Sequence, residues 1–357
     1  MARAAFAALV CGVLLLAGCG SDDAGDDATD DVSTGEGDEG GGDAGGESSG
    51  DAGGDTGDAA FPVTIEHTYG STTVPERPER VAAVGLMDQD ALLALGIVPV
   101  ATTEWFGEQP GAIWPWAADE LEAAGGEAPV VVGDSTDINY EGIAAEDPDL
   151  ILALYSGVTE EEYERLSEIA PTVGHPAGQV DYGIGWAELT RTTGRAVGMA
   201  DEAEALIDDV EAQFDAARAE YPAFAEATAV MATPYEGIFV YGPDDPRGQF
   251  LTALGFELPD GLADVTGDEF GANLSEERVE MLDVDAIVWL DAAEAEDVGG
   301  ALYESLPVHT EQREVFLESS DPLGAATSFV TVLSLPLLLE ELVPMLADAV
   351  EGSAAAS

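Results

Sequence analysis

Lysine is absent from this sequence of 357 residues, and cysteine and histidine are rare. All ten cationic residues are arginines, against 73 aspartates and glutamates, which gives a formal net charge of -63 at pH 7. Nucleic-acid binding requires cations that neutralise phosphates, so this charge excludes nucleic acid as a default partner. Self-repulsion at such a charge density destabilises a compact chain at low salt. We therefore hypothesise that the protein works at high ionic strength.

The salt hypothesis predicts that added sodium chloride raises the thermal midpoint of unfolding. Near 1 M salt the Debye length falls to about 3 Å, so repulsion between exposed carboxylates is screened. Scanning calorimetry at increasing salt measures this effect, and a midpoint that falls as salt is added would contradict the hypothesis.

The scarcity of histidine limits the chemistry that the chain can carry. His67, His175 and His309 lie far apart in the sequence, and none belongs to a cluster with metal-ligand spacing. The sequence also contains no Gly-x-Ser-x-Gly nucleophile turn and no phosphate-binding glycine loop. We therefore expect no catalytic residue, no cofactor and no enzymatic activity. Convergence of the histidines with an aspartate in the fold would instead indicate a zinc- or manganese-binding protein.

Long apolar runs are missing as well. The run at 4–17 follows Arg3 and is too short for a membrane span, but it is typical of a signal peptide. It ends in Leu-Ala-Gly-Cys at 16–19, which resembles a bacterial lipobox. We expect residues 1–18 to be a lipoprotein signal peptide. Cys19, one of two cysteines, would then be lipidated and would anchor the protein to the outer face of the cell membrane.

The segment that follows has nothing to bury. Residues 19–60 consist almost entirely of Gly, Asp, Ala, Ser, Thr and Glu, a composition typical of disorder. We interpret this segment as an acidic tether. The most apolar later run, 333–346, contains Glu340 and Glu341 and therefore predicts an amphipathic terminal helix rather than a membrane span.

Two segments of the remaining chain repeat each other. Residues 141–154 match 277–290 without a gap, and each copy predicts a short helix, an Asp-containing turn and a continuously apolar strand. Such strands are buried on both faces, as in a parallel sheet covered by helices. Residues 90–97 likewise match 249–256, and both predict a helix closed by glycine. The order of these repeats predicts two related α/β lobes.

The repeats also suggest where the lobes begin and end. Helical spacing over 201–220, ended by Pro222, predicts one long rigid helix between an N-terminal lobe at 61–200 and a C-terminal lobe at 221–350. Apolar runs predict strands in both lobes. These strands are expected near 81–84, 98–101, 130–132, 150–154 and 172–174 in the first lobe, and near 229–233, 238–241, 286–290 and 314–317 in the second.

The order of motifs along the chain resembles a known family. After the lipobox and tether come Val-Pro-Glu-Arg-Pro-Glu-Arg-Val at 74–81, Asp-Pro-Asp-Leu-Ile-Leu at 147–152, Asp-Pro-Arg-Gly at 245–248 and Leu-Pro at 335–336. This order is similar to that of the iron–siderophore and vitamin B12 substrate-binding proteins of ABC importers, especially the iron–siderophore lipoproteins. The resemblance covers nearly the whole domain.

The resemblance implies an α/β fold of two similar lobes, each with a central, mostly parallel sheet. One long helix joins the lobes, and the ligand lies in a cleft between them. It implies a monomer outside the cytoplasm that captures a ferric siderophore and delivers it to an ABC importer permease dimer. A cobalamin or haem binder of the same fold is an alternative, and a structural cell-surface lipoprotein is another.

Family members dock on the permease through one surface glutamate in each lobe. The matching motifs here are Asn-Tyr-Glu-Gly-Ile at 139–143 and Ser-Glu-Glu-Arg-Val at 275–279, which assign this role to Glu141 and Glu277. The two residues occupy equivalent positions of the internal repeat. Alternatively, both are ordinary acids at helix N-termini, where the helix dipole favours them. Glu276 competes with Glu277 for the same role.

Candidate ligand-binding residues follow the ends of predicted strands, where open α/β sheets bind ligands. Aromatic walls with polar handles suit a bulky chelate, although some of these rings will be core residues. Trp289, inside a strand, is assigned to the core. The candidates are Trp105, Trp114, Trp116, Tyr155, Tyr235, Tyr241, Arg247, Ser328 and Phe329.

Arg247 is the candidate with the clearest chemistry, because cations are scarce and it opens a helix after a Pro- and Gly-rich loop. A surface ion pair with Asp244 or Asp245 is the alternative. Ferric tris-catecholates are strongly anionic and require several converging cations. With Arg247 as the expected cation, a neutral or cationic ferric hydroxamate is the favoured ligand.

Overall fold

The computed structural model describes residues 61–235, 237–291 and 300–356. They belong to one compact unit that spans residues 54–357. The expected signal peptide, the lipidation site at Cys19 and the whole of the tether lie outside the described residues. Within the described part of the chain, no helix has the length and apolar character needed to cross a membrane.

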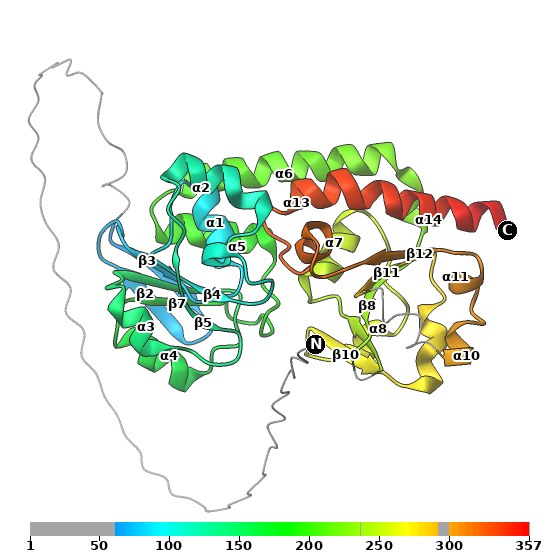
Figure 1. Cartoon of the computed structure of the whole chain (residues 1–357), viewed down its shortest axis with the longest axis horizontal. Coiled ribbons are helices and arrows are strands. Elements are labelled where there is room, and N and C mark those ends of the chain that lie inside the picture. Colours follow the sequence, from blue (N-terminus) through cyan, green and yellow to red (C-terminus); the bar gives the residue numbers. More distant parts are fainter. Residues whose placement is uncertain (1–60, 236, 292–299, 357) are drawn as a thin grey trace, which may run out of the picture. The chain divides into compact units, whose positions relative to one another are not determined.

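The N-terminal lobe alternates strands and helices (Figure 1). Its strands are β1 (Val63–His67), β2 (Gly70–Val74), β3 (Val81–Ala83), β4 (Ala101–Glu104), β5 (Val130–Asp134), β6 (Leu150–Ala153) and β7 (Thr172–Gly174). Its helices are α1 (Asp88–Ala94), α2 (Ala118–Ala124), α3 (Tyr140–Ala145), α4 (Glu160–Ser167) and α5 (Trp186–Ala196), with 3₁₀ turns η2 (Pro110–Ala112) and η3 (Pro115–Ala117).

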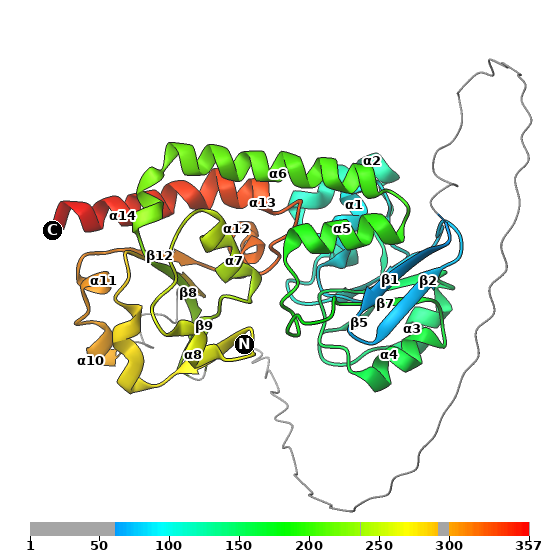
Figure 2. The same ribbon diagram turned by 180° about the vertical axis from the view of Figure 1, so that it is seen from behind.

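Five of these strands form a fully parallel sheet in the order β5-β4-β3-β6-β7. Its central strands are buried on both faces. In β6, Leu150 and Leu152 face one core, whereas Ile151 and Ala153 face the other. This alternation confirms the prediction that a continuously apolar strand lies between two helical layers. Strands β1 and β2 form a separate hairpin that packs beside β7 and α5 (Figure 2).

The C-terminal lobe has a sheet of mixed direction. Its strands are β8 (Ala229–Thr233), β9 (Ile238–Tyr241), β10 (Gly271–Leu274), β11 (Ala286–Leu290) and β12 (Glu314–Leu317). Its helices are α7 (Pro246–Ala253), α8 (Leu262–Thr266), α10 (Gly300–Tyr303), α11 (Pro307–Thr310), α12 (Pro322–Ala326), α13 (Leu335–Leu337) and α14 (Val343–Ala356), with 3₁₀ turns η4 (Pro222–Glu226) and η5 (Glu276–Leu282) and a π-helical turn η6 (Leu338–Leu342).

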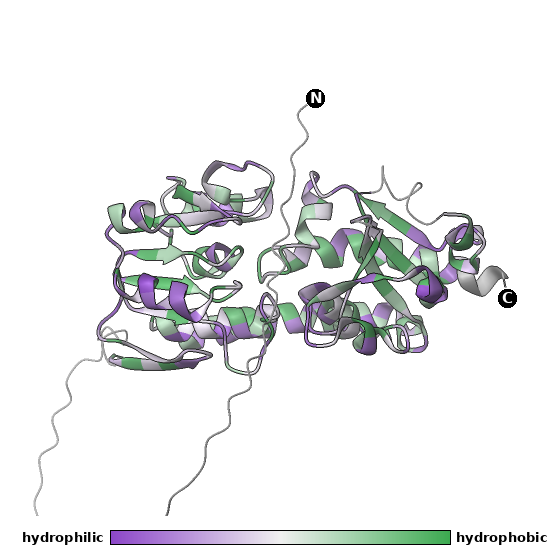
Figure 3. Cartoon of the chain, turned by 90° about the horizontal axis from the view of Figure 1, so that it is seen from below, coloured by the Kyte–Doolittle hydropathy of each residue, from purple (hydrophilic) through white to green (hydrophobic). Residues whose placement is uncertain are grey.

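The second sheet has the order β10-β9-β8-β11-β12, in which β8, β11 and β12 are parallel. Strands β9 and β10 run antiparallel to their neighbours. Figure 3 shows the strands of both sheets coloured mainly as hydrophobic. Trp289 of β11 is fully buried, in agreement with its assignment to the core.

Helix α6 (Ala200–Glu220) joins the lobes, as predicted for 201–220. Its buried residues recur every three or four positions and form one stripe. Ala203 belongs to a core of the N-terminal lobe, whereas Val210, Phe214 and Ala217 belong to a core of the C-terminal lobe. The helix therefore spans two hydrophobic cores. Figure 1 shows α13 and α14 running beside it.

The internal repeat is visible in the hydrogen bonds. Asp149 accepts hydrogen bonds from the backbone N–H groups of Glu79 and Arg80 at 2.8 and 2.9 Å, immediately before β3. Asp285, its partner in the repeat, accepts one from the Thr228 N–H at 2.8 Å, immediately before β8. Each aspartate thus ties the start of its own strand to the start of the neighbouring central strand.

The remaining predictions differ from the structure in detail. The strand expected at 98–101 is β4 at Ala101–Glu104, because Pro99 has no N–H to contribute to a ladder. The sequence pattern did not predict the β1–β2 hairpin or β10. On the side of β8 away from β11, the second lobe has only a single parallel bridge, Thr228 to Glu257, and β9 pairs antiparallel with the other end of β8.

Candidate functional site

The loops after β4 and β6 carry a group of contacting aromatic rings. Trp105 follows directly on β4, and its ring lies 5.7 Å from that of Tyr155, which follows β6. Phe106 contacts Trp105 at 5.3 Å and Trp114 at 5.6 Å. We call these rings, together with Trp116, the aromatic wall. The parallel strands place the wall at the carboxyl edge of the first sheet, where open α/β sheets bind ligands.

Two tryptophans of the wall are stacked face to face. Trp114 and Trp116 flank Pro115, and their rings are 5.2 Å apart with an interplanar angle of 1°. Gly107 permits this packing, because its φ is +93° and an added Cβ would overlap the Trp114 ring. Trp114 is 2% exposed, whereas Trp116 is half-buried. The 3₁₀ turn η3 holds the pair in this orientation.

A segment of the C-terminal lobe packs against the wall. Phe329, in residues 328–331 between α12 and α13, is 2% exposed. We call residues 328–331 the bridging segment. The ring of Phe329 lies between 5.1 and 5.8 Å from four rings of the wall, Trp105, Phe106, Trp114 and Trp116. The wall is therefore completed by a ring from the other lobe.

Arg247 enters the same region from the start of α7. Asp245 caps this helix by accepting from the Arg247 N–H at 2.8 Å, and Pro246 takes the first helical position, which needs no N–H. The Arg247 side chain is 4% exposed. Its Nη1 donates to both Asp245 oxygens at 3.1 Å, and its Nη2 donates to the Ser328 hydroxyl at 2.8 Å.

The surroundings of Arg247 keep it charged. Its guanidinium lies over the Tyr241 ring at 4.0 Å and interacts electrostatically with Tyr155. Burial opposes the charge, but the Asp245 carboxylate and the two tyrosines hold the pKa of Arg247 above its ordinary value. Burial and nearby Asp245 raise the pKa of Tyr155, so its hydroxyl stays protonated. Among the residues that the structure describes, the buried Arg247 Nε has no hydrogen-bond partner.

Most of the predicted ligand residues lie in this one region. The wall, Phe329 and Arg247 with its neighbours include Trp105, Trp114, Trp116, Tyr155, Tyr241, Arg247, Ser328 and Phe329. Tyr235, in the loop between β8 and β9, is 38% exposed and is not among these contacting residues. The ion pair considered for Arg247 exists with Asp245, but the sequence-based alternative of a surface pair is wrong, since both partners are buried.

Several further residues of the region did not stand out in the sequence. Phe106 belongs to the wall, and Tyr182 packs on Tyr155 at 5.5 Å and on Phe270 at 6.2 Å. Gln249 donates to the Gly183 carbonyl at 3.1 Å, which joins α7 to the other lobe. A signal for Tyr182 was present, because it lies between Asp181 and Gly183 in a glycine-containing loop. It also has a φ of +58°, which non-glycine residues adopt rarely.

The two candidate docking glutamates occupy equivalent places. Glu141 lies in the first turn of α3, which precedes β6, and Glu277 lies in the first turn of η5, which precedes β11. Both side chains are exposed. Asn139 caps α3 by accepting from the Gly142 N–H at 2.9 Å, so the first motif also has a structural role.

The histidines do not form a metal centre. His67 and His175 both contact the Tyr69 ring, at 6.3 and 6.1 Å between ring centroids, whereas His309 pairs with Glu314 at 3.0 Å in the other lobe. Within the described residues, no group of three or more His, Cys, Asp or Glu side chains could hold a metal ion.

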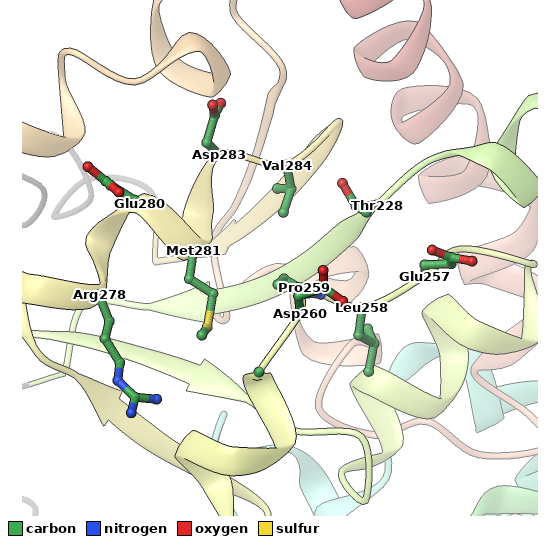
Figure 4. A pocket seen from close by; sticks show the side chains of 11 residues that line it. Thr228, Glu257, Leu258, Pro259, Asp260, Arg278, Glu280, Met281, Asp283 and Val284 are labelled. Atoms are coloured by element: carbon green, nitrogen blue, oxygen red, sulfur yellow. The ribbon is translucent and has the colours of Figure 1, made fainter.

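A separate hollow of about 600 Å³ lies in the C-terminal lobe (Figure 4). It opens beside the single parallel bridge between Thr228 and Glu257, on the side of β8 away from β11. One wall comes from η5, with Arg278, Glu280 and Met281, and the facing wall comes from the loop after α7. It lies at the amino-terminal ends of β8 and β11. No residue of the aromatic wall lines it.

Comparison with known proteins agrees with this architecture. A solved periplasmic solute binding protein from Mycobacterium smegmatis is 31% identical with a TM-score of 0.67, over 83% of this chain and 100% of that one. PiaA of Streptococcus pneumoniae, solved in complex with ferrichrome, is 25% identical with a TM-score of 0.73, over 81% and 99% of the two chains.

Two sequence comparisons agree with the structural ones. The probable siderophore-binding lipoprotein YfiY of Bacillus subtilis is 28% identical over 239 residues, which cover 63% of this chain and 68% of the relative. The family model described as periplasmic binding protein matches residues 81–305. This match, together with the two-lobe fold, shows that the chain belongs to the periplasmic binding protein family.

Proposed function

We propose that this protein captures a ferric siderophore outside the cytoplasm and delivers it to an ABC importer. The observation that supports the proposal most directly is the burial and incomplete hydrogen bonding of Arg247. Its guanidinium is buried at the aromatic wall and keeps one N–H group, at Nε, without a partner in the described chain. An unpaired buried donor is costly unless something accepts from it, so a ligand oxygen is the natural partner.

The aromatic wall fits the rest of such a ligand. Indole and phenol rings offer broad apolar contact with few polar groups, which suits a bulky chelate whose metal is enclosed. The names of relatives support the same class, because YfiY is described as siderophore-binding and PiaA was solved with ferrichrome.

The charge of the site favours a neutral ferric hydroxamate. The positive charge of Arg247 is balanced within the protein by Asp245, which accepts two hydrogen bonds from it. A tris-catecholate with several negative charges would therefore meet no net positive charge there, while the whole chain carries -63. A neutral trihydroxamate avoids this repulsion and still offers oxygen acceptors to Nε.

The proposal includes the place where the protein works. A monomer anchored by lipidated Cys19 would hold the two lobes near the outer face of the membrane, and the acidic segment 19–60 would serve as the tether. Glu141 and Glu277 would each meet arginines on one subunit of the permease dimer. Their exposure and equivalent positions in the repeat support this assignment.

A tryptophan-fluorescence titration of the purified protein in high salt tests the function. Ferrichrome is expected to give saturable quenching with a Kd below about 1 μM, because the iron complex would touch several indoles. Ferric tris-catecholates, cobalamin and haem are titrated in parallel. Trp114→Phe is expected to weaken binding, whereas Trp186→Phe serves as the matched control, since Trp186 stacks on Phe214 and does not belong to the aromatic wall.

The titration also separates the alternatives. A response to cobalamin or haem alone would move the function to a different ligand class of the same fold. No response to any of these compounds would favour a cell-surface lipoprotein without a transport role.

A further inference from the structure

A buried carboxylate outside the predicted set joins the two lobes at the aromatic wall. Asp90, in α1, is 1% exposed. One of its oxygens, Oδ2, accepts two hydrogen bonds, from the Trp116 indole N–H at 2.8 Å and from the Thr331 hydroxyl at 2.6 Å. Trp116 belongs to the N-terminal lobe and Thr331 to the bridging segment of the C-terminal lobe. A single oxygen therefore links both sides of the candidate site.

Both donors restrict the position or orientation of aromatic rings that line the candidate site. The indole N–H bond fixes the rotation of Trp116, whose ring is parallel to that of Trp114. Thr331 is the end of the bridging segment that lies nearest to α1, and its N–H donates to the Ser334 hydroxyl at 2.9 Å. The other end of that segment, Ser328, is held by Arg247. Phe329 therefore lies between Ser328, which is bonded to the C-terminal lobe, and Thr331, which is bonded to the N-terminal lobe.

We propose that Asp90 is a positioning residue for ligand binding. It fixes the position of the stacked Trp114–Trp116 pair relative to the bridging segment. This proposal rests on the proposed function, because the ligand is taken to bind at the wall. Asp90 itself would not touch the ligand. It would act through Trp116 and, by way of Thr331, through Phe329.

The titration of Asp90 provides a measurement that distinguishes positioning from simple packing, because a residue that only packs would not make ligand affinity depend on pH. Burial raises the pKa of Asp90 to about 6, against the opposing effect of its two hydrogen bonds. The charged group that faces it is Glu120 of α2, whose Oε2 is buried without a hydrogen-bond partner in the described chain. On the same helix, the Asp88 carboxylate accepts hydrogen bonds from the backbone N–H groups of Leu154 and Tyr155 at 2.8 and 3.0 Å.

The protonation state of Asp90 gives the direction of the pH effect. Above pH 6 the carboxylate is ionised, and charge-assisted hydrogen bonds from Trp116 and Thr331 are strong. Below pH 6 it takes up a proton and accepts more weakly. Affinity for ferrichrome, a neutral ligand, is therefore expected to fall several-fold between about pH 7.5 and about pH 5.

The experiment compares variants of the full chain by ferrichrome titration. Asp90→Leu removes the acceptor and is expected to weaken binding by about tenfold to a hundredfold at neutral pH, since hydrogen bonds to charged groups are lost. Asp90→Asn keeps one acceptor oxygen for both donors and is expected to restore affinity to within about threefold. It should also reduce the pH dependence, although any part due to Asp88, whose pKa burial likewise raises to about 6, would remain. Glu120→Gln should keep the dependence with its midpoint at lower pH, because a neighbouring like charge is gone.

Thr331→Val provides a milder variant in case Asp90→Leu folds poorly. It is expected to weaken binding on its own but to add little in the Asp90→Leu background, because both changes break the same bond. Thr327→Val is the matched control, since this buried threonine donates only to Gly324 of its own helix and should leave binding unchanged.

A second measurement needs no ligand. The stacked indoles should give an exciton couplet in circular dichroism that Asp90→Leu weakens and Asp90→Asn preserves. If the wild type binds none of the ferric complexes, the proposed function fails, and the couplet still tests whether Asp90 positions the pair. Wild-type binding and an unchanged couplet in Asp90→Leu would overturn the proposal. Binding by Asp90→Asn that is as weak as that of Asp90→Leu would also overturn it, because charge rather than positioning would then be required.

Discussion

Replacing Arg247 with alanine is expected to remove ferrichrome binding and to lower the free energy of unfolding by about 3–5 kcal/mol. The ligand would lose its unpaired donor at Nε. The fold would lose the counter-ion of Asp245, which is fully buried and would keep only the N–H of residue 247. Urea unfolding and fluorescence titration measure the two effects separately.

Two further variants separate the ligand effect from the fold effect. Arg191→Ala removes a largely solvent-exposed pair with Glu204 and Glu188, and it is expected to leave both stability and binding nearly unchanged. Asp245→Asn combined with Arg247→Met removes both buried charges, so much of the stability should return while binding does not. Wild-type affinity in Arg247→Ala would contradict the role of Arg247 in the site.

Reversing the charge of Glu141 and Glu277 together is expected to abolish delivery to the permease without changing ferrichrome affinity. Each residue is exposed, and neither belongs to the aromatic wall or the bridging segment, so the ligand site should keep its structure. Loss of one interfacial charge pair costs about 2 kcal/mol or more, which corresponds to docking weakened by about thirtyfold. Uptake of an iron-55-labelled siderophore by cells that carry each variant measures delivery.

The neighbouring glutamates supply the controls for this experiment. Glu276→Arg alters the adjacent exposed position of η5, and Glu280→Arg alters a later one. Both should support nearly normal uptake. If Glu276→Arg blocks uptake and Glu277→Arg does not, the residue assignment drawn from the repeat is wrong, although a docking surface on η5 would stand.

The architecture was predictable because its signals are local. A strand that is apolar at every position, such as Leu150–Ala153, can be buried only between two covered faces. The second copy at Ala286–Leu290 carries the same pattern, and the aspartate before each strand has the same hydrogen-bonding role in both lobes. Periodicity and repetition within short segments were enough to predict these elements.

The reversed direction of β9 in the second sheet could not be predicted in the same way. Ile238–Tyr241 has a buried pattern that is equally compatible with a parallel or an antiparallel partner. Its direction depends on the short loop after β8 and on pairing with β10, which is distant in sequence. Strand direction is thus a property of the pairing and not of the apolar run itself.

The candidate site was predictable in its residue types but not in its contacts. Aromatic residues after strand ends and a rare arginine in a loop were visible in the sequence, and eight of the nine predicted residues lie in one region. Asp90, by contrast, looks like an ordinary acid in the first turn of a helix. Its defining contact is with Thr331, 241 positions away, and no local pattern contains that information.

The burial of Phe329 against the wall has a consequence for which molecules can bind. Phe329 contacts four rings of the wall, so a ligand that binds the ring faces it covers must first displace it. Only the fraction of free protein in which Phe329 is displaced is then competent at those faces. The apparent dissociation constant is then the intrinsic value divided by that fraction. A small molecule that covers one ring gains fewer contacts than are lost when Phe329 is displaced. A bulky chelate that touches several rings gains more contacts than are lost. Rejection of small ligands would therefore come from competition with the protein's own rings, without any steric barrier at an entrance.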